Sequence, residues 1–300
     1  MNVLITGGAG LIGRALSCSM LADRHKVWIL TRSPERVTLP VGCIAVGWDG
    51  RSAQGWGALV NEMDAVVNLA GANLAAWPWT EARRQSFWNS RVWAGQATAE
   101  AIRAAKKKPA VFIQASGVNH YGLRGAPADE SMPPAGDFLA RLTVAWENSS
   151  QPVEGFGVRR AVIRSAVVLS RDNVIMKLME LPARLFAGGR LGDGRQAFPW
   201  IHIADHIRAV RFLLDDERAR GAYNLVAPES ASNAEFTRAL ASRLKRPWWF
   251  HVPAWPMRLA LGGMSGMVLE GRPVQPRRLL EAGFEFKYPT MTEALGELYG

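Results

Sequence analysis

The sequence has only two cysteines, Cys18 and Cys43, and no long uninterrupted apolar run. Both cysteines fall in segments patterned as a helix or a strand, where a lone thiol usually packs as a small buried apolar side chain. Neither a disulfide framework nor a metal site is indicated. A membrane span needs about 18 consecutive apolar residues, and the chain starts directly on a strand pattern without the charged prelude of a signal peptide. We therefore expect a soluble, cytoplasmic protein without a membrane span.

Positive charge is abundant, but clusters of it are scarce. The formal net charge is +10, from 36 lysines and arginines against 26 acidic residues. Nucleic acids and anionic lipids bind clustered basic side chains. The one run, Lys106-Lys107-Lys108, lies at the expected C-terminal end of a helix, where the helix dipole stabilises cations. The dispersed remainder is typical of a solvated surface, so we expect no nucleic-acid partner.

Short apolar runs alternate with helical patterns through the first half of the chain. The runs lie at residues 3–5, 27–30, 43–46, 65–69, 111–114 and 161–163, and the helical patterns at 11–21, 81–107 and 138–149. This alternation is typical of strands joined by crossover helices, which cover both faces of a parallel sheet. The sequence therefore predicts an α/β fold with a doubly wound, Rossmann-like parallel sheet.

A glycine-rich turn, Gly7-Gly8-Ala9-Gly10-Leu11-Ile12-Gly13, joins the first apolar run to the first helical pattern. Glycines permit a tight turn and a close approach of the backbone to a pyrophosphate, whose charge the free N–H groups and the helix dipole stabilise. Gly13 lets the helix pack closely on the strand. The order of strand, glycines, helix and strand predicts a dinucleotide site, and an ordinary glycine-rich turn is the weaker interpretation.

The residues after the second apolar run favour NADP(H) over NAD(H). An acidic residue there would bind the adenosine ribose and repel a 2′-phosphate, but this chain has Thr31-Arg32-Ser33. The planar guanidinium of Arg32 suits a phosphate, Thr31 or Ser33 offers a hydroxyl, and Arg36 adds charge. The alternative is that Arg32 is only a solvated loop residue.

The pattern changes after about residue 170. Residues 188–194 are too glycine-rich for a regular element, and segments containing proline and tryptophan follow. We therefore place the dinucleotide-binding domain at residues 1–170 and a smaller substrate lobe at 171–300. An apolar run at residues 223–226 predicts a strand that completes the sheet at about 221–228.

Several segments resemble a known family. Residues 6–13, with Asn68-Leu69-Ala70-Gly71, resemble the extended or atypical short-chain dehydrogenase/reductases, and later segments resemble the YfcH-type epimerase family. Those later segments are Ser90-Arg91, residues 145–147, 164–169, 188–192, 200–205 and 224–228, and residues 276, 282–284 and 294–295 resemble that group's short C-terminal domain of unknown function, placed at about 248–297. The resemblance spans nearly the whole chain. It implies an NADP-dependent nucleotide-sugar epimerase or oxidoreductase, a description taken from the fold rather than from known substrates.

The glycine turn, the strand ends and the resemblance together predict the residues around the dinucleotide. Leu69, Ala70 and Gly71 end a strand at the carboxyl edge where ligands bind, and Val168 follows a run whose end should approach the nicotinamide. Arg91 either reaches a phosphate or holds the loop beside it. The full set is Gly7, Gly10, Leu11, Ile12, Gly13, Thr31, Arg32, Leu69, Ala70, Gly71, Arg91 and Val168.

The usual catalytic pair of short-chain reductases is missing. These enzymes use Tyr-x-x-x-Lys on a helix, with the lysine lowering the pKa of the tyrosine. Glu147 resembles the glutamate that follows this pair, and counting back from it places Leu139 and Thr143 at the two positions. Leucine cannot exchange a proton.

A substitute arrangement uses Ser116 to polarise a carbonyl and Tyr121 or His120 to donate the proton. The alternative is that Tyr121 is structural and that His120 is a solvated loop residue. His202 and Asp205 are interpreted as orienting the substrate lobe and lying near a helix N-terminus, rather than as an acid/base pair. Residues 186, 196, 198 and 200 are candidates for an aromatic-sided pocket.

Two functions from different classes follow. The first is an NADPH-dependent reductase or epimerase acting on an unidentified small carbonyl or sugar-nucleotide substrate. The second is an NADP(H)-binding sensor or assembly partner without chemistry, which the loss of the catalytic pair favours. A homodimer is common among such enzymes, although no segment identifies an interface.

Overall fold

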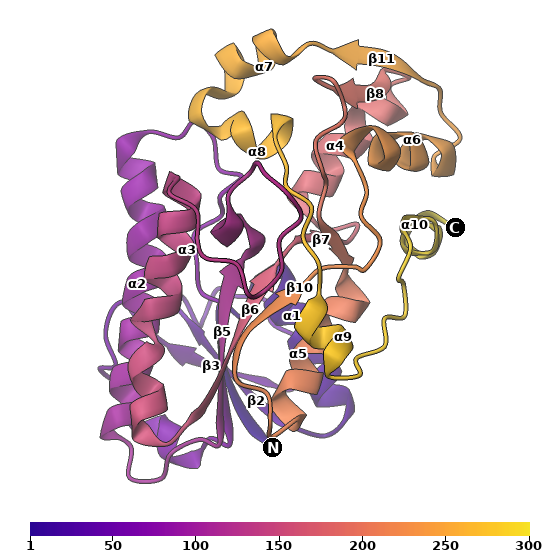
Figure 1. Ribbon diagram of the computed structural model, residues 1–300. Coiled ribbons are helices and arrows are strands. Elements are labelled where there is room, and N and C mark those ends of the chain that lie inside the picture. Colours follow the sequence, from indigo (N-terminus) through magenta and orange to yellow (C-terminus); the bar gives the residue numbers. More distant parts are fainter.

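A seven-stranded parallel sheet forms the centre of the computed structural model, which describes residues 1–300 (Figure 1). The strands follow the order β10-β6-β5-β4-β1-β2-β3, and each neighbouring pair is parallel. They are β1 (Asn2–Thr6), β2 (Lys26–Thr31), β3 (Cys43–Gly47), β4 (Ala65–Asn68), β5 (Val111–Gly117), β6 (Arg159–Ser165) and β10 (Gly221–Leu225). The strand order reverses between β1 and β4, where such sheets bind ligands at the carboxyl ends. The predicted fold class is confirmed.

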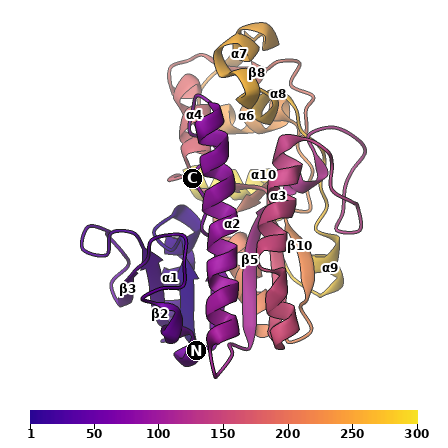
Figure 2. The same cartoon turned by 90° about the vertical axis from the view of Figure 1, so that its left-hand side faces the viewer.

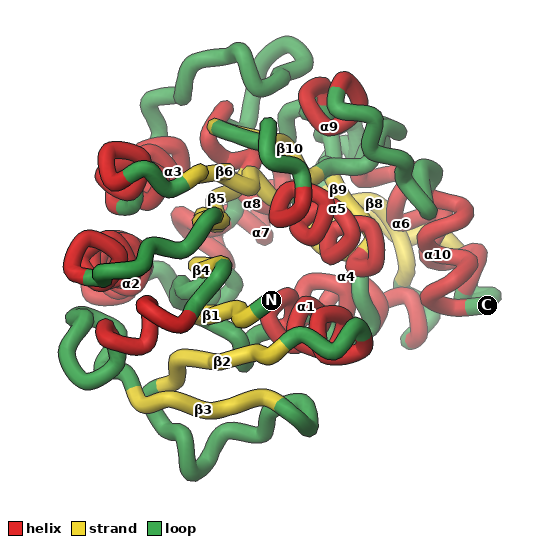
Figure 3. The backbone as a smooth tube through the Cα atoms, turned by 90° about the horizontal axis from the view of Figure 1, so that it is seen from below, coloured by secondary structure: helices red, strands yellow, loops and turns green.

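Helices cover both faces of the sheet. Helices α1 and α5 lie on one face, and α2 and α3 lie side by side on the other (Figures 2 and 3). Their bounds are α1 (Leu11–Ala22), α2 (Glu81–Ala104), α3 (Phe138–Ser149) and α5 (Ile203–Asp215). Because side chains alternate along a strand, β1 sends Val3 and Ile5 into the core beneath α1 and α5, and Leu4 into the core beneath α2. Burial on both faces explains why these strands are apolar at consecutive positions.

A smaller lobe lies beyond the carboxyl ends of the strands (Figure 1). It contains two pairs of short parallel strands, β7 with β9 and β8 with β11. Its elements are β7 (Val167–Leu169), α4 (Val174–Arg184), β8 (Gly188–Leu191), β9 (Trp200–His202), α6 (Asn233–Arg243), β11 (Trp248–Val252), α7 (Ala254–Leu261) and α8 (Gly266–Leu269). The chain then returns along the sheet edge, where α9 (Arg277–Glu281) lies beside β10, and ends with α10 (Met291–Tyr299), which packs on α6.

Four 3-10 helices connect these elements. They are η1 (Gly57–Glu62), η2 (Val118–Tyr121), η3 (Gln151–Phe156) and η4 (Gly262–Met264). The second of them follows β5 directly, so it lies at the carboxyl edge of the sheet beside α3. Because η2 contains His120 and Tyr121, it holds both candidate residues at this edge.

The prediction that residues 188–194 form no regular element was wrong, because the segment contains β8. This strand pairs with β11. A Cβ at Gly189 would lie 1.6 Å from the carbonyl oxygen of Phe250, so the close approach of the partner strand requires glycine here. Glycine marks a strand in this segment because a neighbouring backbone occupies the space of a side chain.

The two cysteines are unpaired, and Cys18 is exposed on α1 while Cys43 is half-buried on β3. The expected burial is therefore wrong for Cys18, which lies on the solvent side of its helix. No helix combines the length and the hydrophobicity that crossing a membrane requires.

Candidate active site

The glycine-rich turn packs against the end of β4. Gly7 has a φ of 66°, and a Cβ there would lie 2.7 Å from the backbone carbon of Leu69. A Cβ on Gly13 would lie 2.5 Å from Cα of Gly8, so α1 can pack against the turn only with glycine at this position. These close approaches bring together two segments that the sequence assigns to one dinucleotide site.

Helix α1 begins with free backbone donors. Gly10 is its N-cap and offers no side chain to the first amides. The first helical amide with a carbonyl partner in the chain belongs to Arg14, which donates to the oxygen of Gly10 at 2.9 Å. The preceding amides of Leu11, Ile12 and Gly13 are thus available, and with the positive end of the helix dipole they suit a pyrophosphate. The residues of this turn fit a dinucleotide.

The end of β2 carries a cation and no acid. Thr31 is half-buried and accepts a hydrogen bond from the amide of Ser33 at 3.4 Å, whereas Arg32 is exposed. The Cδ atom of Arg32 lies 4.0 Å from the position of a Cβ on Gly50, and its guanidinium has no partner in the chain. The guanidinium is therefore free to bind an anion. Its contact with a 2′-phosphate stays a prediction.

The other strand ends in the predicted set lie at the same edge. Leu69 and Ala70 follow β4, and the amide of Ala70 donates to Oγ1 of Thr6 at 3.2 Å. Val168 is buried in β7, and its carbonyl accepts a hydrogen bond from Nδ2 of Asn173 at 2.6 Å. The structure thus places Leu69 and Ala70 at the carboxyl end of β4 and Val168 in the short strand after β6, and their contacts with a cofactor stay predictions.

Arg91 on α2 lies beside the loop after β4. Its side chain is buried, its Nη1 donates to the carbonyl of Phe87 at 3.1 Å, and its Cζ lies 4.7 Å from the ring centroid of Trp146. A Cβ on Gly71 would lie 3.1 Å from the same Cζ. Burial lowers the pKa of Arg91 to about 10, which leaves it charged at neutral pH. Arg91 thus packs beside the loop but bonds to its own helix, and both the loop-holding role and a phosphate contact stay predictions.

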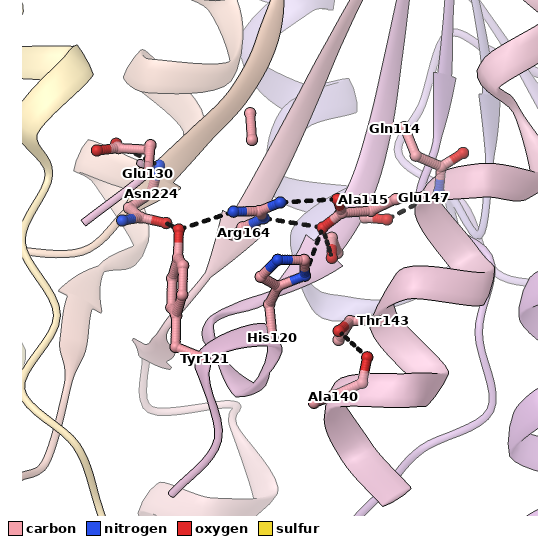
Figure 4. Close-up of polar contacts among 12 residues, drawn as sticks. Gln114, Ala115, His120, Tyr121, Glu130, Ala140, Thr143, Glu147, Arg164 and Asn224 are labelled. Atoms are coloured by element: carbon pink, nitrogen blue, oxygen red, sulfur yellow. Dashed lines mark hydrogen bonds and ion pairs between the residues drawn. The ribbon is translucent and has the colours of Figure 1, made fainter. Parts of the chain in front are cut away.

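The buried carboxylate of Glu147 joins Ser116 on β5 to Arg164 on β6, and Figure 4 shows its contact with Arg164. Oγ of Ser116 donates to Oε1 of Glu147 on α3 at 2.7 Å. Arg164 on β6 forms two parallel hydrogen bonds with the same carboxylate, each of 2.9 Å. Burial opposes the charge of Glu147, but the hydrogen bonds and charge of Arg164 outweigh it and hold the pKa of Glu147 below its usual range. The carboxylate is therefore ionised and fixed in place.

Tyr121 lies on the other side of Arg164. Its hydroxyl accepts a hydrogen bond from Nη1 of Arg164 at 2.9 Å and donates one to Oδ1 of Asn224 at 2.8 Å. The side chain has no exposed surface, and burial raises its pKa. A proton donor must reach the substrate, whereas this hydroxyl is fully engaged inside the protein. The geometry therefore supports the structural alternative for Tyr121.

His120 is not the solvated loop residue considered above, because it is only 4% exposed. Its Nδ1 lies 3.6 Å from Oε1 of Glu147 and has no hydrogen-bond partner, since Ser116 and Arg164 already occupy that oxygen. Burial lowers the pKa of His120 to about 4 despite the nearby carboxylate, so the ring is neutral at pH 7. A hydrogen on Nδ1, facing the carboxylate, leaves Nε2 as an acceptor.

The positions of the missing catalytic pair lie in α3. Leu139 is 5% and Thr143 is 6% exposed. Oγ1 of Thr143 donates to the carbonyl of Ala140 at 2.7 Å, within its own helix (Figure 4). Neither a leucine nor a threonine side chain can act as an acid or base near pH 7, so these two positions cannot replace the missing pair.

His202 and Asp205 connect α5 to the C-terminal segment. His202 is the N-cap of α5, and its Nε2 lies 3.0 Å from a carboxylate oxygen of Glu297. Asp205 is fully buried and accepts hydrogen bonds from the amides of Lys287 and Tyr288 at 2.7 and 2.8 Å. These contacts support the orienting role and the position near a helix N-terminus.

The predicted aromatic pocket does not form. Trp200 is fully buried in the core of the lobe, Phe198 stacks on Phe236 with ring centroids 4.2 Å apart, and Phe186 is exposed against Arg246. The prediction was wrong because the spacing of these residues says nothing about which of them the lobe uses for its own packing.

A cavity of about 380 Å³ opens elsewhere, between the starts of α2 and α3, the loop after η2 and the lobe helices η4 and α8. Its lining includes Leu139, Phe138, Trp79, Arg84 and Met267. Sequence reasoning missed Arg84, because Arg83-Arg84 at the start of a helix resembles an ordinary solvated face. It also missed the pairing of Glu147 with Arg164, although both residues stood in the motifs that carried the resemblance.

Two family models match the chain. The model of the NAD dependent epimerase/dehydratase family matches residues 3–225, and that of a domain of unknown function, DUF1731, matches residues 252–298. The epimerase family protein SSP1921 of Staphylococcus saprophyticus is 36% identical over 299 residues, which cover 99% of each chain. The epimerase family protein SH2119 of Staphylococcus haemolyticus is 35% identical over 98% of each.

Solved structures agree with these matches. The human epimerase family protein SDR39U1, crystallised with NADPH, is 35% identical with a TM-score of 0.90, covering 100% of this chain and 99% of that one. A nucleoside-diphosphate sugar epimerase from Corynebacterium glutamicum is 27% identical with a TM-score of 0.79, covering 100% of this chain and 58% of that one.

Proposed function

The chain belongs to the NAD dependent epimerase/dehydratase family, and on that premise we propose that it is an NADP(H)-dependent reductase or epimerase of a small carbonyl or sugar-nucleotide compound. The observation that carries the proposal is the cluster of Ser116, Glu147 and His120 at the carboxyl edge of the sheet. Ser116 lies on β5, the strand next to β4. The end of β4 packs against the glycine turn. A dinucleotide groove beside a fixed hydroxyl and an imidazole is suited to hydride transfer coupled to proton transfer.

The preference for NADP(H) rests on the end of β2. Arg32 is exposed and has no carboxylate partner, and the adjacent Thr31 and Ser33 bring hydroxyls rather than an acid. A 2′-phosphate there would meet one fork-shaped cation and no repulsion. The crystallisation of the human relative with NADPH supports the same choice.

At the reacting oxygen of the substrate, His120 transfers the proton and Ser116 binds the oxygen. Bound NADP(H) supplies or accepts the hydride at the reacting carbon. In the oxidative direction the hydroxyl proton of the substrate passes to Nε2 of neutral His120, which becomes an imidazolium that the carboxylate of Glu147 stabilises across 3.6 Å. In the reductive direction the imidazolium returns that proton to the carbonyl oxygen. Ser116 donates its one hydroxyl hydrogen to Glu147 at 2.7 Å in the resting site, and it binds a carbonyl oxygen by turning that hydrogen toward the substrate.

Turnover measurements test the catalytic assignment. Carbonyl compounds and sugar nucleotides are screened for NADPH oxidation or epimer formation. Ser116→Ala combined with His120→Asn should then lower kcat at least tenfold. Tyr121→Phe is the comparison, because its hydroxyl is buried and its removal should lower stability without moving the pH profile of kcat. Unchanged turnover in the double variant would refute the assigned residues.

A titration with NADPH and NADH tests the cofactor assignment separately. Arg32→Ala should weaken NADPH binding about tenfold, the loss of one charge-assisted interaction, and leave NADH binding unchanged. Arg103→Ala, at the far end of α2, is the matched control and should change neither affinity. Failure of the wild-type protein to bind either nucleotide would overturn the dinucleotide site itself.

A sensor without chemistry is the second candidate, favoured by Leu139 and Thr143 at the proton-exchange positions. It predicts tight NADP(H) binding with no turnover of any screened compound, and a partner protein whose affinity depends on the nucleotide. A partner bound equally well with and without NADP(H) would contradict it.

A further inference from the structure

We propose that the cavity at the lobe interface binds the substrate, and that this substrate is a small carbonyl compound with an apolar or aromatic body and an anionic group that binds Arg84. The proposal rests on the proposed function, because it assigns the cavity to the same active site. The volume of about 380 Å³ lies near the lower end of the ~300–1,000 Å³ range of small-molecule sites. It therefore favours a compact ligand over a sugar nucleotide.

The cavity is lined by residues next to, or on the same elements as, those that carry Ser116, His120 and Glu147, although none of these three lines it. Gly122, which lines it, directly follows η2, the helix that carries His120. Leu139, which also lines it, occupies the position where related enzymes place the catalytic tyrosine. On the opposite side the lobe contributes Met267 from α8. A ligand here would lie between the dinucleotide domain and the lobe.

One wall of the cavity is aromatic and apolar. Trp79 and Phe138 meet edge to face, with ring centroids 6.0 Å apart and planes inclined by 65°. The indole Nε1 of Trp79 donates to the carbonyl of Leu74 at 2.9 Å, so its polar atom is satisfied away from the ligand. With Leu139 and Met267 alongside, this wall offers surface for an apolar or aromatic group.

Arg84 is the unusual member of the lining. Its guanidinium makes no hydrogen bond or ion pair within the chain, and its Nε is buried without a partner. The group lies over Phe138, with Cζ 5.4 Å from the ring centroid. A Cβ on Gly263 of the lobe would lie 2.7 Å from Nη2, so glycine leaves the room that the guanidinium occupies. Arg84 as a whole is half-buried and lines the cavity, so its unpaired guanidinium is available to an anionic group of a ligand there.

The acidic residues of the lining are already engaged. Glu270 forms an ion pair with Arg124 at 2.5 Å. Asp137 is the N-cap of α3, where its Oδ1 accepts a hydrogen bond from the amide of Ala140 at 2.9 Å. The lining contains two arginines and two carboxylates, so its formal charges balance. Arg84 is nevertheless the one of these cations that has no ion-pair partner. A carboxylate or phosphate on the substrate matches its planar fork.

Calorimetry on the protein saturated with NADP⁺ tests this assignment. The ligands are phenylglyoxylate and phenylpyruvate, with acetophenone as a neutral analogue. We expect at least one of the two acids to bind, with Arg84→Gln weakening its binding about tenfold or more. Acetophenone should bind the wild type more weakly than that acid does. Its affinity should be the same for the wild type and for Arg84→Gln. Arg83→Gln is the matched control, since Arg83 lies beside Arg84 on α2 and donates to the carbonyl of Pro78 instead.

A second variant guards against misfolding of the first. Gly263→Ala should displace the guanidinium and weaken the acid in the same way, whereas Gly155→Ala, with open space around its Cβ position, should not. Failure of both acids to bind, or equal affinities for wild type and Arg84→Gln, would overturn the proposal. Binding of the acid without NADPH oxidation would support the cavity assignment and count against the enzymatic function. Turnover of another carbonyl compound, when neither acid binds, would support the enzymatic function and overturn the cavity assignment.

Discussion

Replacing Glu147 by glutamine should destabilise the protein strongly, because Arg164 would keep its charge in a buried position. Both of its hydrogen bonds to the carboxylate are 2.9 Å long, and Arg164 is only 7% exposed. Removing one partner of such a buried ion pair costs about 3–5 kcal/mol of unfolding free energy. Glutamine preserves the size of the side chain, so the loss reports the charge rather than a cavity.

That free energy converts into a melting shift. An unfolding entropy of about 2.1 cal/mol/K per residue gives about 0.6 kcal/mol/K for a chain of this length. A loss of about 3–5 kcal/mol therefore lowers Tm by about 5–8 °C. Differential scanning calorimetry at pH 7 measures it directly.

Glu154→Gln is the matched control for this prediction. Glu154 pairs with Arg160 at 3.0 Å, but its side chain is 48% exposed, and Arg160 also donates to Oγ of Ser150. Such a half-exposed pair contributes roughly 0–1 kcal/mol, so Tm should fall by less than about 2 °C. Equal shifts for the two variants, or a shift under about 2 °C for Glu147→Gln, would refute the argument that a buried carboxylate holds this site together.

Three further outcomes are expected. Gly7→Ala should weaken NADPH binding at least tenfold in calorimetry, because its φ is 66° and its Cβ would meet the backbone after β4 at 2.7 Å. Burial lowers the pKa of His120 and His206 to about 4, below the ordinary value of 6.5. The unfolded chain therefore binds more protons between those values, and the urea midpoint should fall as pH drops from 6.5 to 4. Gly189→Ala should separate β8 from β11 and speed amide hydrogen exchange in β11.

Each of these outcomes has its own control. Gly55→Ala shares a positive φ of 82° but has open space around its Cβ position, so it separates backbone strain from the steric clash. Gly136→Ala likewise lies in open space and should leave β11 protected. The pH argument fails if the urea midpoint is constant from pH 6.5 to 4, and His206→Asn should make the decline shallower because it removes one of the two buried rings.

Most of the sheet was predictable because its strands are buried on both faces. Consecutive residues such as Val3, Leu4 and Ile5 pack alternately into the two cores on either side of the sheet. All of them are therefore apolar, and the strand is visible in the sequence as an unbroken apolar run. The predicted boundaries of α3 agree with the structure because Asp137 caps its start. The glycine turn was predictable for a similar reason, since Gly7 and Gly13 each occupy a position that admits no Cβ.

What the sequence did not reveal depends on partners far along the chain. The strand at Gly189 exists because Phe250 approaches it, and nothing local announces that contact. Likewise His120 resembles a loop histidine, and its burial follows from α3 and β6 packing over it with Glu147 and Arg164. Propensity describes a residue's neighbours in sequence, whereas these two positions are determined by neighbours in space.

The absent catalytic pair and the buried ion pair are parts of one electrostatic arrangement. In the usual pair, a lysine lowers the pKa of the tyrosine and so prepares it to transfer a proton. Here the fixed cation beside Tyr121 is Arg164, and Glu147 balances its charge, so this cluster has no unpaired positive charge to activate the Tyr121 hydroxyl. Burial then keeps His120 neutral, with Nδ1 toward the carboxylate. On the function proposed above, neutral His120 is the form that accepts the proton of an alcohol, and reduction requires His120 to be protonated first.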